Sequence, residues 1–215
     1  MAMNIVELLN NFFTVITVFG PIINYLPQYR LMTKNNSLGS FSTLTCYILL
    51  IANLLRVIFW FGKAYLLSLL LQSIIMIIVQ MVLLRKCYHI LNRKDSRGKF
   101  LGSILMLTLS SGTYYAFFSI FKNNVFIEVT GGLSACIEAM LPFPQFVTNI
   151  KRKSVVGLSF SMIFMWFVGD AMKLVYYLGN DQPLQFIICA IIQLVIDVCI
   201  LSQFVLYRKK AVKKD

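Results

Sequence analysis

Long apolar runs, each bounded by polar or charged residues, dominate this chain. Seven runs are long enough to cross a hydrocarbon layer of about 30 Å, which takes about 20 apolar residues in a helix. They predict transmembrane helices at residues 5–28, 41–62, 65–84, 100–121, 124–147, 158–179 and 183–207. The short connections leave no room for a separate soluble domain, so the predicted fold class is an all-α integral membrane protein.

The composition supports this interpretation. Hydrophobic residues make up 59% and charged residues 13% of the 215 positions, whereas a soluble domain carries about 25% charged residues. The first apolar run lacks the basic start and the small-residue cleavage site of a secretory signal, so we expect it to be retained as a helix.

The positive charges predict an orientation. A net charge of +12 would suggest a nucleic-acid partner for a soluble protein, but here the basic residues gather after alternate spans. After spans 1, 3, 5 and 7 lie Arg30, Lys34, Arg85, Lys86, Arg93, Lys94, Arg97, Lys99, Lys151, Arg152, Lys153, Arg208, Lys209, Lys210, Lys213 and Lys214. The other side carries Lys63 and Lys122. Because positive loops stay in the cytosol, we expect a lumenal N-terminus, a cytosolic tail and no nucleic-acid partner.

The chain shows no pattern typical of an enzyme or a metalloprotein. The cysteines have no paired metal spacing and are expected to be small core residues; they are Cys46, Cys87, Cys136, Cys189 and Cys199. His89, the only histidine, falls in a basic loop. No nucleophile with a base and no phosphate-binding Gly-rich loop is recognisable, so we expect neither enzymatic activity nor a cofactor.

An internal repeat organises the chain. Leu-Pro-Gln-Tyr at residues 26–29 recurs 117 positions later as Phe-Pro-Gln-Phe at 143–146, and a basic loop with matching serines follows each copy. In the same register Asn53 and Arg56 match Asp170 and Lys173. Further along, Gln72 and Gln80 match Gln185 and Gln193.

Each repeat covers three spans, and the fourth span links them. Without this linker, a second unit of three helices would be inverted. We therefore predict parallel three-helix units in a 3+1+3 arrangement, as in SWEET transporters. The predicted parts are a first repeat at 1–88, a basic cytosolic loop and linker helix at 89–122, a second repeat at 123–207 and a basic tail at 208–215.

These motifs identify a family resemblance over essentially the whole chain. It rests on Tyr-Leu-Pro-Gln-Tyr-Arg at 25–30, Ala-Asn-Leu-Leu-Arg at 52–56, Phe-Trp-Phe-Gly at 59–62, Glu-Ala-Met-Leu at 138–141, Met-Trp at 165–166, Gly-Asp-Ala at 169–171 with Lys173, and Pro-Leu-Gln-Phe at 183–186. With these residues the chain resembles the PQ-loop repeat proteins of the SWEET clan, and within them a branch of the solute carrier proteins.

The two proline-glutamine pairs are candidate hinges. They are Pro27 with Gln28 and Pro144 with Gln145. Proline removes a backbone donor and bends a helix, and the resemblance implies that such motifs flex. The alternative is that each proline only ends its helix at the cytosolic interface.

Polar residues within the spans form a candidate substrate or proton pathway. They are Asn53, Arg56, Glu138, Asp170, Lys173 and Asp197. A charge at mid-membrane costs of order 3 kcal/mol, so each needs a partner or a polar route. In the alternative interpretation Arg56 and Lys173 extend their side chains towards the lumen, and Asp170 pairs with Lys173.

The resemblance implies a phospholipid scramblase of endosomal and trans-Golgi membranes that influences bilayer asymmetry and endosome-to-Golgi traffic. Its partners would be membrane phospholipids. The family also contains proton-coupled exporters of small polar solutes such as amino acids, and Asp197 fits an aspartate of that branch. However, Trp166 stands where those exporters have another proton-coupling aspartate. A membrane scaffold without transport is a third alternative, and the sequence leaves the oligomeric state open.

Overall fold

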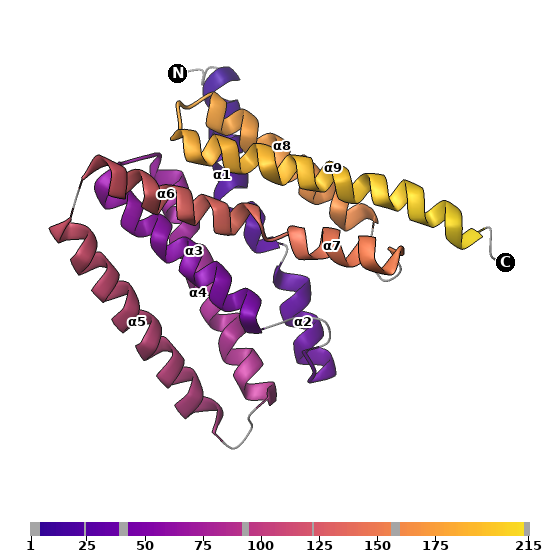
Figure 1. Ribbon diagram of the computed structural model, residues 1–215, viewed down its shortest axis with the longest axis horizontal. Coiled ribbons are helices and arrows are strands. Elements are labelled where there is room, and N and C mark those ends of the chain that lie inside the picture. The colour runs from indigo at the N-terminus through magenta and orange to yellow at the C-terminus, as the bar shows by residue number, and fades with distance from the viewer. Residues whose placement is uncertain are drawn as a thin grey trace. The chain divides into compact units, whose positions relative to one another are not determined.

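The computed structural model describes residues 5–23, 25–38, 43–91, 95–121, 123–155 and 160–212, and its secondary structure there is helical (Figure 1). The helices are α1 (Ile5–Ile23), α2 (Tyr25–Asn35), α3 (Thr43–Gly62), α4 (Leu67–Leu91), α5 (Ser96–Ile120), α6 (Asn124–Ala139), α7 (Phe143–Arg152), α8 (Phe160–Leu178) and α9 (Leu184–Val212). The fifth predicted span consists of the consecutive helices α6 and α7, and the first contains α1 and α2, which flank residue 24 outside the described residues. The nine helices of the described residues therefore correspond to the seven predicted spans.

Each proline-glutamine pair lies at the beginning of a helix. Pro27 is the third residue of α2, and Pro144 is the second residue of α7. The first turn tolerates proline because its N–H groups have no partner within the helix. The spans predicted to end at 28 and 147 continue past both prolines to Asn35 and Arg152.

The helices α2 and α7 also end alike. Asn36 and Lys153 follow them with backbone φ angles of 47° and 48°, and these residues are 117 positions apart. The N–H of Lys153 donates to the carbonyl oxygens of Asn149 and Ile150, a common end for a helix. The backbone thus repeats with the register expected from the sequence.

Residues Met1–Ser134 form one compact unit. In it α3 packs along α4, while α1 and α5 also contact α4. One core cluster consists of Met32, Cys46, Leu50, Leu83, Leu84 and Cys87. In the same unit, a Cβ atom on Gly131 would lie 2.8 Å from the ring of Phe59, so glycine lets α6 approach α3 closely.

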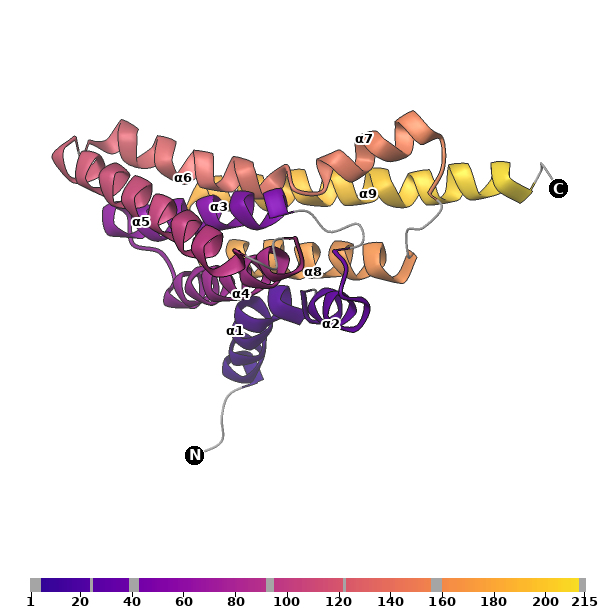
Figure 2. The same ribbon diagram turned by 90° about the horizontal axis from the view of Figure 1, so that it is seen from below.

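Residues Ala135–Asp215 form a second compact unit. Here α8 packs along α9, and α7 lies beside the later part of α9 (Figures 1 and 2). One core cluster consists of Ile163, Ile196, Ile200 and Phe204. Ile163 and Ile200 occupy the repeat positions of Cys46 and Cys87, which agrees with the prediction that these cysteines fill core space. Cys189 is also buried, but Cys136 is exposed, contrary to that prediction.

Within the described residues, five helical segments are long and apolar enough to span a membrane. They are Thr43–Gly62, Leu67–Leu91, Ser96–Ile120, Asn124–Arg152 and Leu184–Tyr207. Only 6% of the Ser96–Ile120 window is buried, against 44% for each of the first two. The linker helix α5 therefore leaves most of its surface free to face lipid.

Two further predicted spans also end too early at their basic ends. The third span was predicted to end at residue 84, but α4 continues through Arg85 and Lys86 to Leu91. The last helix likewise continues past residue 207 to Val212. Long basic side chains reach the membrane surface from a continuing helix, so these charges do not mark where the helix stops.

Candidate functional site

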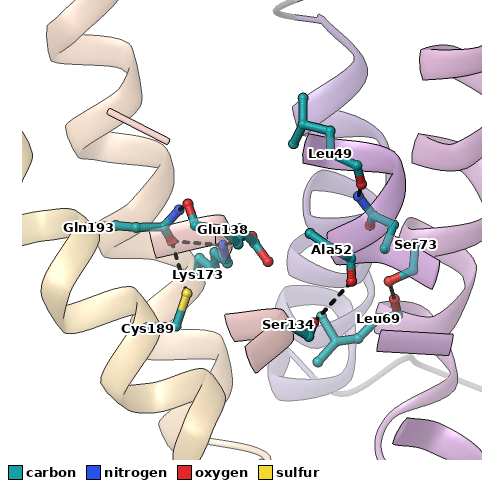
Figure 3. Close-up of polar contacts among 10 residues, drawn as sticks. Leu49, Ala52, Leu69, Ser73, Ser134, Glu138, Lys173, Cys189 and Gln193 are labelled. Carbon is teal, nitrogen blue, oxygen red and sulfur yellow. Dashed lines mark hydrogen bonds and ion pairs between the residues drawn. The ribbon is translucent and has the colours of Figure 1, made fainter. Parts of the chain in front are cut away.

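Lys173 occupies the centre of a polar cluster in the second unit. From α8, its ammonium group donates hydrogen bonds to Glu138 Oε1 on α6, at 2.6 Å, and to Gln193 Oε1 on α9, at 3.0 Å (Figure 3). The side chains of Lys173 and Glu138 are only 13% and 17% exposed. The thiol of Cys189 donates to the same Gln193 oxygen, and the ammonium lies 5.9 Å from the Tyr177 ring centre. One cation thus connects three helices.

The interruption before α7 contributes a further contact to this cluster. In an α-helix the N–H of residue 142 would bind the carbonyl of Glu138, but Pro142 has no N–H. Instead Gln193 Nε2 donates to this carbonyl at 3.4 Å, and the N–H of Leu141 donates at 3.2 Å. Gln193 therefore binds both the backbone of Glu138 and the ammonium of Lys173.

Two further carboxyl groups lie near this cation. Asp197 follows Gln193 by one turn of α9 and is 1% exposed. No donor among the described residues reaches its carboxyl oxygens with regular hydrogen-bond geometry, but the carboxyl group of Asp170 is near enough to share a hydrogen bond with it. Asp170, one turn before Lys173 on α8, interacts with Asp197 electrostatically, and so does Lys173 itself.

The cluster therefore contains three carboxyl groups and one ammonium group. A buried charge is stabilised only while its oppositely charged partner stays beside it. Lys173 is already paired with Glu138. Asp170 and Asp197 remain as polar groups in a membrane interior, where an unbalanced charge is costly. The arrangement favours a polar or cationic occupant beside Asp170 and Asp197. No group of three or more metal-binding side chains occurs among the described residues.

The first unit places Asn53 and Arg56 differently. Asn53 Nδ2 donates to the Leu49 carbonyl of its own helix at 2.8 Å. Arg56 is 2% exposed, and its backbone carbonyl accepts a hydrogen bond from the Tyr65 hydroxyl at 2.8 Å. Gln80 is fully buried, and its amide has no partner in the described part of the chain.

The structure brings together four of the six predicted pathway residues, namely Glu138, Asp170, Lys173 and Asp197. The acid that accepts a hydrogen bond from Lys173 is Glu138, whereas Asp170, its partner in the alternative interpretation, interacts with the ammonium electrostatically. The local reason is that Glu138 stands at the end of α6, opposite Lys173, whereas Asp170 lies on the cation's own helix.

The hinge residues occupy equivalent places in the two repeats. Pro27 and Pro144 begin α2 and α7. The side chain of Gln28 lies outside the described residues, whereas Gln145 Nε2 donates to Asn149 Oδ1 at 2.7 Å. Sequence reasoning did not assign a role to Gln193 or Asn149. The match of Gln193 to Gln80 was the available signal for Gln193, and Asn149 had none.

Comparisons with known proteins agree with the repeat. The profile of the PQ loop repeat matches residues 9–69 and again residues 126–186. Together these matches cover more than half of the chain, and they are offset by the same 117 positions as the two sequence motifs. Over 83 residues, or 38% of this chain, the sequence is 31% identical to Scramblase ANY1 of Saccharomyces cerevisiae. The match spans only 20% of that relative's length.

The fold is similar to that in the 3.7 Å resolution structure of a eukaryotic SWEET transporter. The TM-score is 0.67, and the match covers 93% of this chain and 94% of the other at 16% sequence identity. This likeness confirms the predicted all-α fold with seven transmembrane helices in a 3+1+3 arrangement.

Proposed function

This chain belongs to the PQ-loop repeat family, and we propose that it is a phospholipid scramblase of endosomal and trans-Golgi membranes. In this role it would influence bilayer asymmetry and endosome-to-Golgi traffic. The similarity to Scramblase ANY1 supports the activity, and the resemblance to PQ-loop proteins is the basis for the compartment. The observation that carries the proposal is the polar cluster around Lys173 in the second unit.

Scrambling needs a polar surface within the membrane, because a phospholipid headgroup cannot cross hydrocarbon without losing its hydration. The ammonium of Lys173 and the carboxyl groups of Asp170 and Asp197 offer both signs of charge, as a zwitterionic headgroup requires. The acyl chains can stay in the bilayer while the headgroup moves. Such exchange uses no ion gradient.

A specific observation favours a second candidate, a proton-coupled exporter of a small polar solute. Asp197 is almost completely buried, and its nearest polar group is another carboxyl group, that of Asp170. A carboxyl group in this situation is suited to take up and release a proton. Such a protein would move its solute faster when a pH gradient is applied. A membrane scaffold would show neither activity.

The test is reconstitution of the purified full chain into vesicles that contain a trace of fluorescent phospholipid. A membrane-impermeant quencher removes only outer-leaflet fluorescence from protein-free vesicles, and we expect it to remove inner-leaflet fluorescence as well when the chain is present. Parallel vesicles loaded with labelled amino acids test export. Solute flux that needs a pH gradient, without lipid flipping, would favour the exporter, and neither activity would favour the scaffold.

Two matched variants connect the activity to the cluster. Glu138→Gln removes a carboxylate from the buried pair with Lys173, whereas Glu128→Gln removes one from the exposed pair with Lys63, which has the same length of 2.6 Å. We expect slower flipping for Glu138→Gln and an unchanged rate for Glu128→Gln. Equal rates in both variants would mean that the polar cluster is not on the lipid route.

A further inference from the structure

A chain of side-chain hydrogen bonds runs from the second proline-glutamine pair to α9. Gln145 Nε2 donates to Asn149 Oδ1 at 2.7 Å, and Asn149 Nδ2 donates to Gln203 Oε1 at 2.8 Å. Gln203 Nε2 then donates to the carbonyl of Phe146 at 3.2 Å. Asn149 and Gln203 are 2% and 4% exposed. The buried amides of Asn149 on α7 and Gln203 on α9 are thus hydrogen-bonded to each other, and Gln145 of the proline-glutamine pair binds Asn149.

Helix α7, which these hydrogen bonds connect to α9, is not a rigid continuation of α6. Between the two helices, Leu141, Phe143 and Gln145 each donate to a carbonyl three residues back. Pro142 and Pro144 cannot donate at all. The regular four-residue bonds resume only at Phe146, which donates to the carbonyl of residue 142. The backbone therefore fixes the direction of α7 weakly, and the contacts between α7 and α9 must hold it in place.

The first repeat does not have this chain of polar side chains. The positions equivalent to Asn149 and Gln203 are Met32 and Ile90. Met32 is fully buried in an apolar cluster, and Ile90 packs against that cluster. Apolar side chains are therefore compatible with this place in the fold. Burying two amides costs more free energy than burying methionine and isoleucine, even when the amides bind each other. Packing alone therefore does not explain why Asn149 and Gln203 occur here.

Hydrogen bonds between amides differ from apolar contacts in how they break. When two helices separate, freed amides can bind water or polar headgroups at little net cost, whereas separated apolar surfaces lose their burial. A bond between Asn149 and Gln203 can therefore open and close repeatedly, provided that polar molecules enter as it opens.

We propose that Asn149 and Gln203 are positioning residues that hold α7 against α9, and that opening of their hydrogen bond lets α7 turn about residues 140–142. Gln145 orients Asn149 for this bond. Release of α7 would expose the interior of the second unit at its α7 end, and closure would seal it. The predicted effect on lipid flipping rests on the proposed function, but the movement of α7 does not.

The movement can be measured directly in the reconstituted full chain. Spin labels at Ile150 on α7 and Val205 on α9, which are both exposed, report the separation of the two helices after Cys136 and Cys199 are replaced by serine. We expect Asn149→Ala and Gln203→Ala each to broaden the distance distribution towards longer values. The double variant should broaden it no further, because the two residues act as one unit.

Flipping is the second readout. Loss of the hydrogen bond between Asn149 and Gln203 should change the flipping rate about fivefold. This factor corresponds to the free energy of one neutral hydrogen bond. The variant with Asn149→Met and Gln203→Ile copies the pairing of the first repeat. We expect it to fold, to restore the narrow distance distribution and to flip lipid more slowly than the unmodified chain.

The two readouts separate the possible failures. An unchanged distance distribution in folded Asn149→Ala would overturn the proposal. If Asn149→Ala does not fold, a methionine–isoleucine variant with unchanged flipping would overturn it. Longer distances in a chain that never flips lipid would support the movement and reject only the scramblase.

Discussion

The two repeats share a backbone plan but differ in the chemistry inside it. In both, a helix that contains a proline-glutamine pair near its start ends at a left-handed residue. At equivalent interior positions, however, the first repeat has Pro21, Asn53, Arg56 and Leu84, and the second has Glu138, Asp170, Lys173 and Asp197. The three acids are thus confined to the second repeat. The common backbone supports the fold, and the acidic chemistry is specific to one half.

A lysine–glutamate pair of the same length occurs among the described residues of each unit, and the two pairs show what burial changes. Lys63 and Glu128 in the first unit approach to 2.6 Å with both side chains 45% exposed. Lys173 and Glu138 also approach to 2.6 Å, but they are 13% and 17% exposed. When one partner of an exposed pair is removed, solvent stabilises the remaining charge. When one partner of a buried pair is removed, the remaining charge has neither solvent nor a counter-charge.

The largest predicted effect follows from this difference. Lys173→Met should lower the free energy of unfolding by about 3–5 kcal/mol, and Lys63→Met should lower it by about 1 kcal/mol or less. Thermal unfolding of the purified proteins in detergent measures both. Addition of Glu138→Gln to Lys173→Met should recover part of the loss, because the carboxylate no longer lacks its cation. Similar losses in the two single variants would contradict the assignment of Lys173 to a buried site.

Most of the fold could be predicted because membrane insertion imposes long apolar runs and repeats are visible in the residues themselves. The span ends could not be predicted as well. Hydropathy locates where hydrocarbon begins, but backbone hydrogen bonds decide where a helix stops, so α4 continues through Arg85 and Lys86. The interruption between α6 and α7 was also missed, because an apolar run has the same pattern whether or not its helix is continuous.

The sequence indicated which charged residues form the candidate site, but not which of them bind each other. A charge within a span is conspicuous in any sequence, which is why Asp197 and Lys173 were recognised. Spacing on one helix suggested Asp170 as the partner of Lys173, yet the acid that binds it comes from another helix. Partners between helices depend on helix rotation and packing, and an amide such as Asn149 carries no signal until its partner is known.

The next effect concerns the hinges, where the second repeat has an additional proline at Pro142. We expect Pro27→Ala and Pro144→Ala each to slow lipid flipping, because each replacement restores a backbone donor and stiffens the helix. Replacement of both Pro142 and Pro144 should slow it most, by about tenfold or 1.4 kcal/mol. The flipping assay measures the rate, and the yield of monodisperse protein serves as the folding control. Equal loss of folded protein in Pro27→Ala and Pro144→Ala would argue for a structural role only.

A smaller effect is predicted for Asp197, whose equivalent in the first repeat is Leu84. Asp197→Asn keeps the size and polarity of the side chain but removes its ability to carry a proton. For a scramblase we expect flipping to change by less than about threefold, with no dependence on an applied pH gradient. Gradient-driven solute efflux that disappears in Asp197→Asn would instead identify an exporter.

The smallest predicted effect is the absence of any change, and it tests whether the repeats are parallel. Asn-Asn-Ser at residues 35–37 is a glycosylation sequon, but we predict that it faces the cytosol and stays unmodified. Arg152→Asn creates the equivalent sequon in the second repeat, because Ser154 already matches Ser37. Parallel repeats place both sites on the same side of the membrane, so neither should carry a glycan. As a positive control, Val125→Ser creates a sequon at Asn123 on the predicted lumenal side. Expression in eukaryotic membranes with and without an endoglycosidase measures all three, and a glycan at only one of the two equivalent positions would show that the repeats are inverted.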